Sequence, residues 1–259
     1  MPTLYGIDGS KKGTVQLGKA FAEPVRVDLI RRAFLAERSR ARQPYSSDPL
    51  AGQRTSAHYH GLRHYRYTMM NREMARLTRI HGRVGYLNFT ARIAPHARKG
   101  RGAHPPQLRD WTEKINRKEW LKAFRSALAA TARAELVRAR GHTAAELFVV
   151  EDRLQTVAKA KELVALLVKL MEPEMDRTKH VRVRGGKATM RGRGRKGKVG
   201  PLLIVAEDKG IGRACRSLAG VDCVTAQQLS VSNLAPGGHP GRLCVWTEAG
   251  LKAIEERVK

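Results

Sequence analysis

The sequence is poor in cysteine, in long apolar runs and in acidic residues. Its three cysteines, Cys215, Cys223 and Cys244, are odd in number and show no C-x-x-C spacing. That pattern argues against a disulfide framework or a cysteine-based zinc site and predicts reduced, buried thiols. The longest apolar run, residues 163–168, is far shorter than the roughly 18 to 20 residues that span a bilayer, and the first residues contain no secretory apolar region. We therefore expect a cytosolic protein with no membrane role.

The shortage of acidic residues leaves a large positive charge. The 259 residues include 50 Lys and Arg but 23 Asp and Glu, which gives a formal net charge of +27. Such a field attracts polyanions, and nucleic acid is the first partner that it predicts. Of the cations 33 are Arg, whose planar guanidinium binds phosphate through two hydrogen bonds and stacks on bases. An apolar content of 42% over this length still allows a substantial core.

The excess charge is concentrated in two segments. Residues 49–109 contain 12 cations and one acid, Glu73, and residues 177–200 contain 10 cations and no acid, whereas cations and acids are nearly balanced elsewhere. The sequence thus predicts a near-neutral body with two cationic appendages. We assign these as a long extended loop, 45–110, inserted between two helices, and a second basic Gly-rich loop, 177–200.

The body has the pattern of an α/β domain. Short apolar runs typical of buried parallel strands occupy residues 147–150, 202–205, 221–224 and 243–246. Amphipathic helices are predicted over 24–40, from Asn116 to 132 with a capping box, over 157–171 with an end near Pro173, and after an N-cap at Thr247. Strands that alternate with helices predict a three-layer α/β/α domain with a mainly parallel central sheet.

The segment 45–110 shows little internal periodicity. A short helix over Thr68 to Leu77 is the one element that its pattern suggests, and Met69, Met70 and Met74 form either a small apolar face or a surface along which other chains pass. About 60 residues greatly exceed the usual connection of roughly 4 to 6. With so few large aliphatic side chains, burial does not offset the entropy of ordering. We expect this segment to fold together with a nucleic acid.

A glycine-rich motif in the second basic segment resembles a nucleotide-binding signature. Residues 192–200, GRGRKGKVG, match both the dinucleotide fingerprint and most of a P-loop. Those motifs follow a strand and precede a helix, whereas here a strand-like run follows the glycines and Val199 stands where Ser or Thr would hold magnesium. We therefore predict a flexible phosphate-binding loop and no cofactor.

Three histidines in the first segment allow several interpretations. His58, His60 and His64 have the spacing of a metal site, but Glu73 is the one nearby acid or cysteine that completes a ligand set. Tyr and Arg side chains interleaved over 59–67 favour stacking on unpaired RNA bases at least as well. A merely solvated basic arm is the third interpretation, and our prediction assigns no metal.

Five segments resemble one known family in its order along the chain. They are PVRVDLIRRA (24–33), DPLAGQRTSA (48–57), RKGRGAHPP (98–106), RSALAATA (125–132) and LAPGGHPGRLCVWTE (234–248). Together they resemble the large-subunit ribosomal protein L-four family in its archaeal and eukaryotic form. The lack of a long extension after Lys259 is more similar to the archaeal type.

The resemblance implies a structural constituent of the large ribosomal subunit, located in the cytoplasm, rather than an enzyme. It implies that the loop threads into large-subunit (23S-type) rRNA, aids assembly, and forms part of the polypeptide exit tunnel wall with another tunnel-constriction protein. The partners would be that rRNA, neighbouring ribosomal proteins and the nascent peptide, which would pass the inner part of the loop near 61–90. The family's tip is rich in small residues, whereas residues 61–82 here are bulkier.

The rRNA-binding residues that we predict are most of the cations of the two basic segments, together with one histidine. They neutralise phosphates and release counterions, and rRNA shape supplies specificity. The set is Arg54, Arg63, Arg66, Arg72, Arg76, Arg79, Arg83, Arg92, Arg98, Lys99, Arg101, His104, Arg182, Arg184, Lys187, Arg191, Arg193, Arg195, Lys196 and Lys198. No catalytic residue is predicted. The alternatives are an RNA-processing enzyme and a non-ribosomal RNA- or DNA-binding protein.

Overall fold

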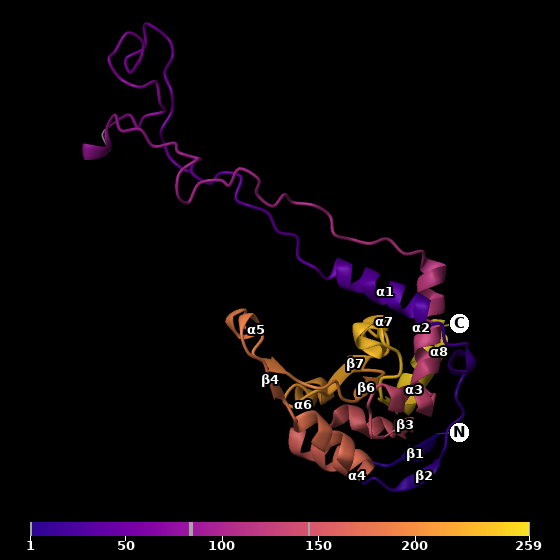
Figure 1. The fold of residues 1–259 in the computed structure, drawn as a ribbon. Coiled ribbons are helices and arrows are strands. Elements are labelled where there is room, and N and C mark those ends of the chain that lie inside the picture. The colour runs from indigo at the N-terminus through magenta and orange to yellow at the C-terminus, as the bar shows by residue number, and fades with distance from the viewer. Residues whose placement is uncertain (1, 83–84, 145, 259) are drawn as a thin grey trace. The chain divides into compact units, whose positions relative to one another are not determined.

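The computed structural model describes residues 2–82, 85–144 and 146–258. The chain forms two compact units. Unit 1 comprises Met1–Ala41 and Thr112–Lys259, and unit 2 comprises Arg42–Trp111. The predicted loop 45–110 thus lies within unit 2, and many of the helices and strands of unit 1 are labelled in Figure 1.

A six-stranded, mostly parallel sheet forms the centre of unit 1. Its strands are β1 (Thr3–Tyr5), β2 (Lys11–Thr14), β3 (Phe148–Val150), β6 (Leu202–Val205), β7 (Asp222–Thr225) and β8 (Cys244–Thr247). The spatial order is β2-β1-β3-β8-β6-β7, and only the β1–β2 pair is antiparallel. All four predicted strands are confirmed to within one residue. The sequence analysis missed β1 and β2, because β2 is fully exposed and carries no apolar pattern.

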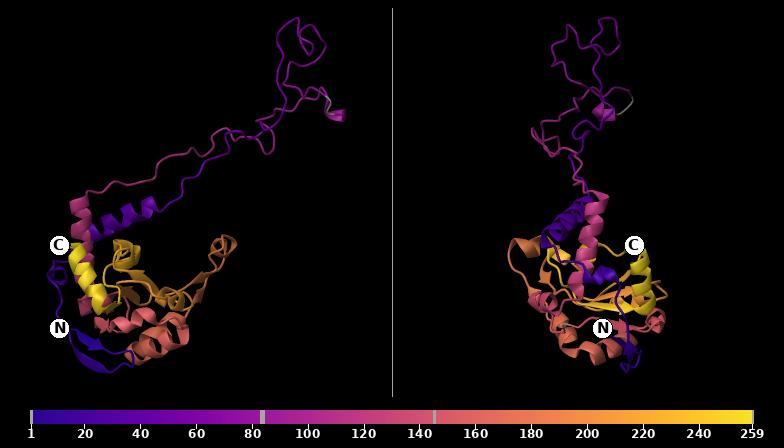
Figure 2. Two further views of the ribbon diagram at one scale, coloured as in Figure 1. Left: turned by 180° about the vertical axis from the view of Figure 1, so that it is seen from behind. Right: turned by 90° about the vertical axis from the view of Figure 1, so that its right-hand side faces the viewer.

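Helices cover both faces of this sheet (Figure 2). Alternate strand residues point to opposite sides, so Val149, Ile204 and Trp246 face one core cluster while Val150, Leu203 and Val245 face the other. The first face packs against α1 (Val27–Arg40), α2 (Arg117–Thr131), α7 (Val231–Leu234) and α8 (Glu248–Val258). The second packs against α3 (Ala134–Ala139), α4 (Ala160–Lys179) and α6 (Ile211–Cys215). The α/β prediction with helices on both sides is confirmed.

The helix starts follow local hydrogen bonds more than cap motifs. Helix α1 begins at Val27 rather than at Pro24, because Ser126 Oγ accepts the Arg26 N–H (2.6 Å) and donates to the Pro24 carbonyl (3.0 Å). Asn116 is the N-cap residue of α2, but its side chain makes no cap hydrogen bond. At α8 the cap is confirmed, since Thr247 Oγ1 accepts the Gly250 N–H at 3.1 Å.

The predicted end of a helix near Pro173 corresponds to a break inside α4, where one helical segment ends and a second begins. Helix α4 continues to Lys179, with a break at Met171, whose φ/ψ of −152° and 55° are not helical. A proline disfavours the helical conformation before it but fits the first turn of a new helical segment. The chain resumes the helix because Glu174, Met175 and Thr178 are buried on the body.

The second basic segment is a small hairpin. Strands β4 (Arg182–Val183) and β5 (Arg195–Lys196) pair antiparallel, with a single helical turn, α5 (Lys187–Met190), between them. The predicted loop boundary at 177 differs from the structure, because residues 177–179 still belong to α4. We call residues 180–200 the basic hairpin.

Unit 2 consists of two parts, which we call the head (residues 57–92) and the arm (42–56 and 93–111). In the head, His58 pairs with Arg79 and Arg79 with Ala91 in isolated antiparallel bridges. Ala57, Met69 and Ile80 are buried there. The predicted helix over 68–77 is wrong: Asn71 adopts a φ of 56°, and the Met69 N–H bonds to the His60 carbonyl instead of to a helical partner.

Hydrogen bonds join the two segments of the arm at two points, and the course of both segments can be followed in Figure 1. The Ser47 N–H bonds to the Pro106 carbonyl at 3.1 Å, and the Ala94 N–H bonds to the Gly52 carbonyl at 3.2 Å. Gly52 has a φ of +75°, and a Cβ there would lie 2.8 Å from the Ala94 oxygen, so only glycine fits this approach.

The cysteines are free thiols, as predicted, but they are not equally buried. Cys215 and Cys244 are buried, whereas Cys223 is half-buried. The prediction is wrong for Cys223 because it lies on β7, an edge strand of the sheet. No helix in the described part of the chain has the length and apolar character needed to cross a membrane.

Candidate nucleic-acid interface

Most of the predicted cations of unit 2 are exposed. Arg63, Arg66 and Arg72 in the head are exposed. The same holds for Arg54, Arg76, Arg92, Arg98, Lys99, Arg101 and His104. Arg54 pairs with Asp48 at 2.8 Å, but the segment 49–109 has only one acid for its 12 cations. The charge of unit 2 is therefore mostly uncompensated within the chain.

Arg79 differs from its neighbours because it organises the head. Its side chain is half-buried, and the guanidinium donates to the carbonyls of Phe89 and Ala75, both at 3.0 Å. These bonds join the segment 75–79 to Phe89, so Arg79 has a structural position. Arg83 lies outside the described residues.

Trp111 holds the base of the arm, and the sequence analysis missed it. Arg42 and Arg109 each lie 3.5 Å from the centre of its indole ring, and Tyr45 stacks on it with a centroid distance of 6.4 Å. Guanidinium groups over an indole face gain cation–π attraction. These contacts bring cations from both segments of the arm to one place. The sequence does not reveal this, because Arg42 and Tyr45 lie far from Trp111 along the chain.

The basic hairpin presents its cations to solvent. Arg182, Arg191 and Arg193 are exposed, as are Lys187, Arg195, Lys196 and Lys198, while Arg184 is half-buried. The Arg184 N–H bonds to the Gly194 carbonyl at 2.7 Å and thereby closes the hairpin. Gly186 and Gly192 take φ values of 64° and 71° on either side of α5, where a side chain is strained. The hairpin is therefore an ordered scaffold for exposed charge.

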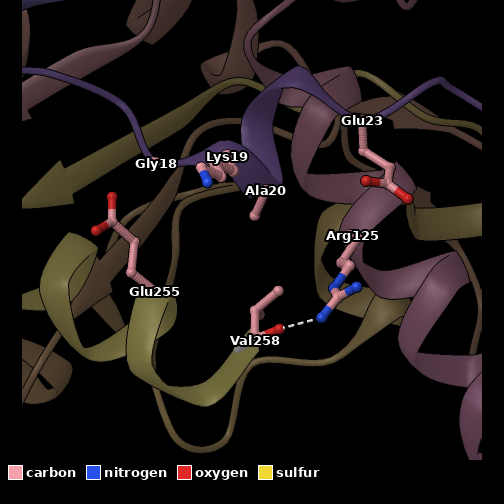
Figure 3. A pocket seen from close by; sticks show the side chains of 7 residues that line it. All are labelled: Gly18, Lys19, Ala20, Glu23, Arg125, Glu255 and Val258. Atoms are coloured by element: carbon pink, nitrogen blue, oxygen red, sulfur yellow. Dashed lines mark hydrogen bonds between the residues drawn. The ribbon is translucent and has the colours of Figure 1, made fainter.

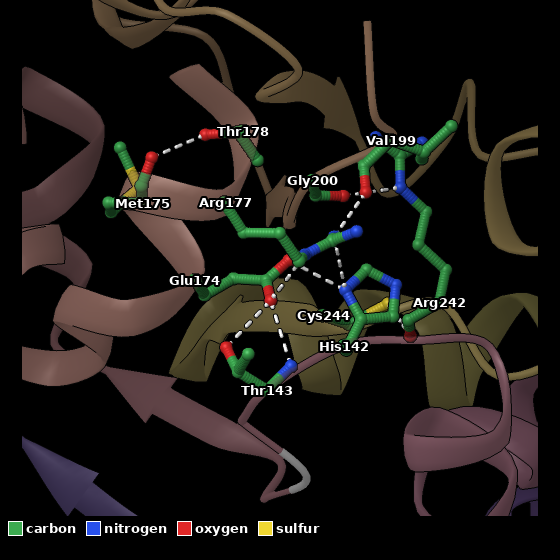
Figure 4. Close-up of polar contacts among 10 residues, drawn as sticks. All are labelled: His142, Thr143, Glu174, Met175, Arg177, Thr178, Val199, Gly200, Arg242 and Cys244. Atoms are coloured by element: carbon green, nitrogen blue, oxygen red, sulfur yellow. Dashed lines mark hydrogen bonds and ion pairs between the residues drawn. The ribbon is translucent and has the colours of Figure 1, made fainter. Parts of the chain in front are cut away.

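A buried ionic network anchors this hairpin to the body (Figure 4). The carboxylate of Glu174 is fully buried and lies 2.7 Å from His142 Nδ1 and 2.5 Å from an Arg177 nitrogen. It also accepts the N–H and the hydroxyl of Thr143, both at 3.0 Å. Arg177 in turn donates to the Val199 carbonyl at 2.6 Å. One carboxylate thus joins α4, the segment before β3 and the end of the hairpin.

The same network sets the pKa of Glu174. Burial alone raises the pKa of a carboxyl group, but hydrogen bonds from His142, Arg177 and Thr143 outweigh burial and lower the pKa of Glu174 to about 2. Because a carboxylate only accepts hydrogen bonds, the His142 nitrogen that faces it carries the proton. Glu174 is ionised at every physiological pH and balances Arg177.

Two further arginines lie beside this network. Arg242 is buried and donates to the Gly200 carbonyl at 3.0 Å, and it pairs with Asp222 at 2.5 Å. Arg140 donates to the carbonyls of Pro236 and His239. Burial, together with the charges of Arg242 and Arg177, lowers the pKa of Arg140 to about 10, so it stays protonated at neutral pH.

A basic pocket of about 550 Å³ opens between α3 and the end of the hairpin. Its lining contains four Lys or Arg side chains, two His side chains and no carboxylate. They are Arg140, Arg177, Lys196, Lys198, His142 and His239. Such a lining favours a phosphate oxygen over any cation. The sequence analysis predicted Lys196 and Lys198 but not the other four. Arg140, His142 and His239 lie in segments of ordinary charge balance, and Arg177 lies at the edge of the basic segment 177–200.

A second pocket lies between the 3-10 helix η1 (Lys19–Ala22), α2 and α8 (Figure 3). Lys19 and Glu255 lie on one side of it, and Glu23 and Arg125 lie on the other. Arg125 donates to the carbonyl of Val258. The Glu23 and Glu255 carboxylates lie on opposite sides of the pocket and do not form a carboxyl pair.

The fold and these surfaces define a class of protein: an α/β domain whose excess cations lie exposed on ordered segments outside the core, suited to a polyanionic partner. A family model described as the Ribosomal protein L4/L1 family matches residues 15–257. The chain belongs to this family, which confirms the resemblance carried by the five sequence segments.

Curated relatives match the chain over nearly its whole length. The large ribosomal subunit protein uL4 of Methanopyrus kandleri is 42% identical over 98% of both chains. The uL4 proteins of Methanocaldococcus jannaschii and Nanoarchaeum equitans are 40% and 39% identical over 98% of this chain and 98% and 97% of their own lengths. All three organisms are archaea, so the relatives are of the archaeal type.

Proposed function

We propose that this protein is a structural constituent of the large ribosomal subunit in the cytoplasm, that it binds large-subunit rRNA, and that it is not an enzyme. The observation that carries the proposal is the exposed charge: of the 19 predicted rRNA-binding residues that the structure describes, all but Arg79 and Arg184 are exposed. Phosphate binding releases counterions from the RNA and draws on this charge. The printed names of the relatives agree with this role.

Unit 2 is the part that we expect to enter the rRNA. A narrow two-chain arm with little apolar surface gains order from RNA contacts on both sides, and it aids assembly by joining RNA segments. The head then contributes to the wall of the polypeptide exit tunnel, beside another tunnel-constriction protein and the nascent peptide. Exposed Tyr59 and Tyr65 offer faces for unpaired bases.

The basic hairpin is the second rRNA anchor. Its glycines allow close backbone approach to phosphate, and the pocket beside it binds a phosphate group. The Glu174 network holds the hairpin in place, so RNA meets a preformed surface.

Sedimentation tests the proposal directly. Tagged protein from its own cells is run on a sucrose gradient after high-salt washes, and each fraction is probed for large-subunit rRNA. Comigration with large subunits through the wash is the expected result. A free peak, or a peak with DNA, contradicts the proposal and favours a non-ribosomal binding protein.

A charge-removal pair tests the hairpin. The triple variant R191Q/R193Q/R195Q removes three exposed cations, and K118Q/K161Q/K252Q removes three exposed cations from the charge-balanced body. For single-stranded RNA each phosphate contact contributes about −0.7 to the slope of log K against log salt concentration. Loss of three contacts therefore makes the slope of the hairpin variant shallower by about 2. The body variant keeps the wild-type slope. Equal losses in both variants show that the hairpin has no special role.

A further inference from the structure

Three histidines meet in the head of unit 2. His58, His60 and His81 place one ring nitrogen each within 4.8 Å of one another. Their rings lie close together, with centroid distances of 4.3 Å, 4.7 Å and 4.6 Å. This is the one group of three or more potential metal ligands within the part of the chain that the structure describes.

The backbone brings them together. His58 pairs antiparallel with Arg79, with hydrogen bonds of 3.2 Å and 3.1 Å in the two directions. Side chains two residues apart on a strand share a face, and paired residues share a face across strands. His60 therefore lies on the face of His58, and His81 lies on the face of Arg79, which is the same one. His64 is exposed and does not belong to the group.

Three ring nitrogens of this cluster lack partners. His60 Nε2 and both ring nitrogens of His81 are buried and have no hydrogen bond. Buried polar atoms are normally satisfied, so three open nitrogens in one place need an explanation. His58 Nδ1 lies 3.1 Å from the Ser56 carbonyl, which acts as acceptor, so Nδ1 carries the proton and Nε2 keeps a free lone pair. A backbone acceptor on the far nitrogen is the usual support of a metal-bound histidine.

Aromatic rings enclose the cluster. Tyr65 stacks on His60 at 4.6 Å between centroids, and Tyr67 stacks on His81 at 4.5 Å. Phe89 meets His81 edge-on at 5.6 Å. Burial first, and then the neighbouring imidazoles, lower the pKa of His60 and His81.

We propose that His58, His60 and His81 bind one transition-metal ion of the zinc class. Imidazole nitrogen suits Zn²⁺, and three histidine ligands leave a fourth position for water or for a phosphate oxygen. A tetrahedral ion with bonds of about 2.0 to 2.1 Å needs nitrogens about 3.3 Å apart, so modest side-chain rotation closes the cluster. The ion joins the segments 57–60 and 78–81 and thereby stabilises the head. This inference does not depend on the proposed function.

The charge around the site limits which metal ion binds there. Arg79 shares the face of the histidines, and Arg66 and Arg72 lie near the rings of Tyr67 and Phe89. These cations disfavour a hard cation that relies on charge alone. The site is therefore better suited to an ion of intermediate softness such as Zn²⁺, whose bonds to nitrogen are partly covalent. The same cations favour an anionic fourth ligand on the metal.

Cobalt(II) spectroscopy on the full, tag-free chain tests the site. Bound Co²⁺ in a four-coordinate site gives a strong visible absorption that six-coordinate Co²⁺ lacks, and Zn²⁺ then displaces it. We expect one equivalent of Co²⁺, no near-ultraviolet band from thiolate ligation, and full displacement by Zn²⁺. No saturable binding, or a thiolate band that points to the cysteines, overturns the proposal.

A pair of histidine variants identifies the ligands. His81→Gln weakens Zn²⁺ binding by more than the roughly 10- to 100-fold that follows the loss of an outer-shell partner. His64 belongs to the set of histidines that sequence spacing alone suggests. The substitution His64→Gln is therefore the control, and it changes Zn²⁺ affinity less than about twofold. Equal effects of the two substitutions refute the ligand set.

Packing of the head needs its own control, because His81 stacks on Tyr67. His58→Gln removes the exposed ligand of the three and leaves that stack intact. We expect the same loss of Zn²⁺ affinity as for His81→Gln, with an unchanged far-ultraviolet circular dichroism spectrum. Wild-type affinity in His58→Gln contradicts the proposal.

Discussion

The ionic network at Glu174 leads to a prediction about acid stability. The substitution Glu174→Gln keeps the shape of the side chain and removes its charge. The pKa of Glu174 falls from its ordinary value of 4.5 to about 2 in the folded protein. One pKa unit corresponds to about 1.4 kcal/mol, so the ionised carboxylate contributes about 3 kcal/mol to the free energy of unfolding at neutral pH.

The sign of the pH dependence follows from the lowered pKa. A carboxyl group whose folded pKa lies below its unfolded pKa stabilises the protein fully above the unfolded value, and this stability is lost as the pH falls through the folded value. The contribution of Glu174 therefore disappears between about pH 4.5 and pH 2. In Glu174→Gln that part of the acid transition is absent, because the amide does not titrate.

Urea unfolding at a series of pH values measures the effect. The difference in unfolding free energy between wild type and Glu174→Gln should be about 3 kcal/mol at pH 7 and should shrink toward zero near pH 2. Glu162→Gln, on the same helix but exposed and paired with Lys159 at 3.4 Å, is the matched control and should change stability by less than about 1 kcal/mol. A difference that stays constant from pH 7 to pH 2 would refute the reasoning, because the cost would then come from packing rather than from charge.

Three further predictions concern the rest of the chain. Residues 49–109 should be cut by trypsin in the free protein and protected by large-subunit rRNA, and equal cleavage in both states contradicts folding with RNA. Trp246→Ala should lower the free energy of unfolding by about 3 to 5 kcal/mol in urea titrations, because its side chain is fully buried in the core. A thiol reagent should modify half-buried Cys223 first, since burial raises the pKa of Cys244 to about 12, and a hydrogen bond with Cys223 followed by burial raises that of Cys215. Earlier labelling of Cys244 in the folded protein contradicts this order.

Much of unit 1 was readable from the sequence. The four runs that form β3, β6, β7 and β8 were predicted to within one residue. For β3, β6 and β8 the reason is that a strand buried on both faces is a continuous apolar run. The amphipathic stripes of α1 and α8 were also predicted, since each buries one face only. Helix α2 was predicted as well, although residues 126–131 at its end are all buried. The two cationic segments followed from counting charge along the chain.

Elements whose stability comes from distant partners were not readable in this way. Strand β2 has no apolar pattern and exists through its pairing with β1. The helical segment of α4 that follows Pro173 is stabilised by the hydrogen bond of Glu174 with His142, a residue 32 positions earlier. Local propensity contains no information about such partners.

The sequence by itself determined the fold class, the family and the sign and place of the charge, because these depend on periodicity, motif order and composition. Only the tertiary structure decided which side chains meet. Spacing suggested His58, His60 and His64 as one group, but the antiparallel pairing of His58 with Arg79 selects His81 instead. Likewise the basic pocket joins Arg140 to Lys198, from segments that composition treats as unrelated. The physical reason is that a site is built by register and packing between distant segments, and neither is encoded in any one segment alone.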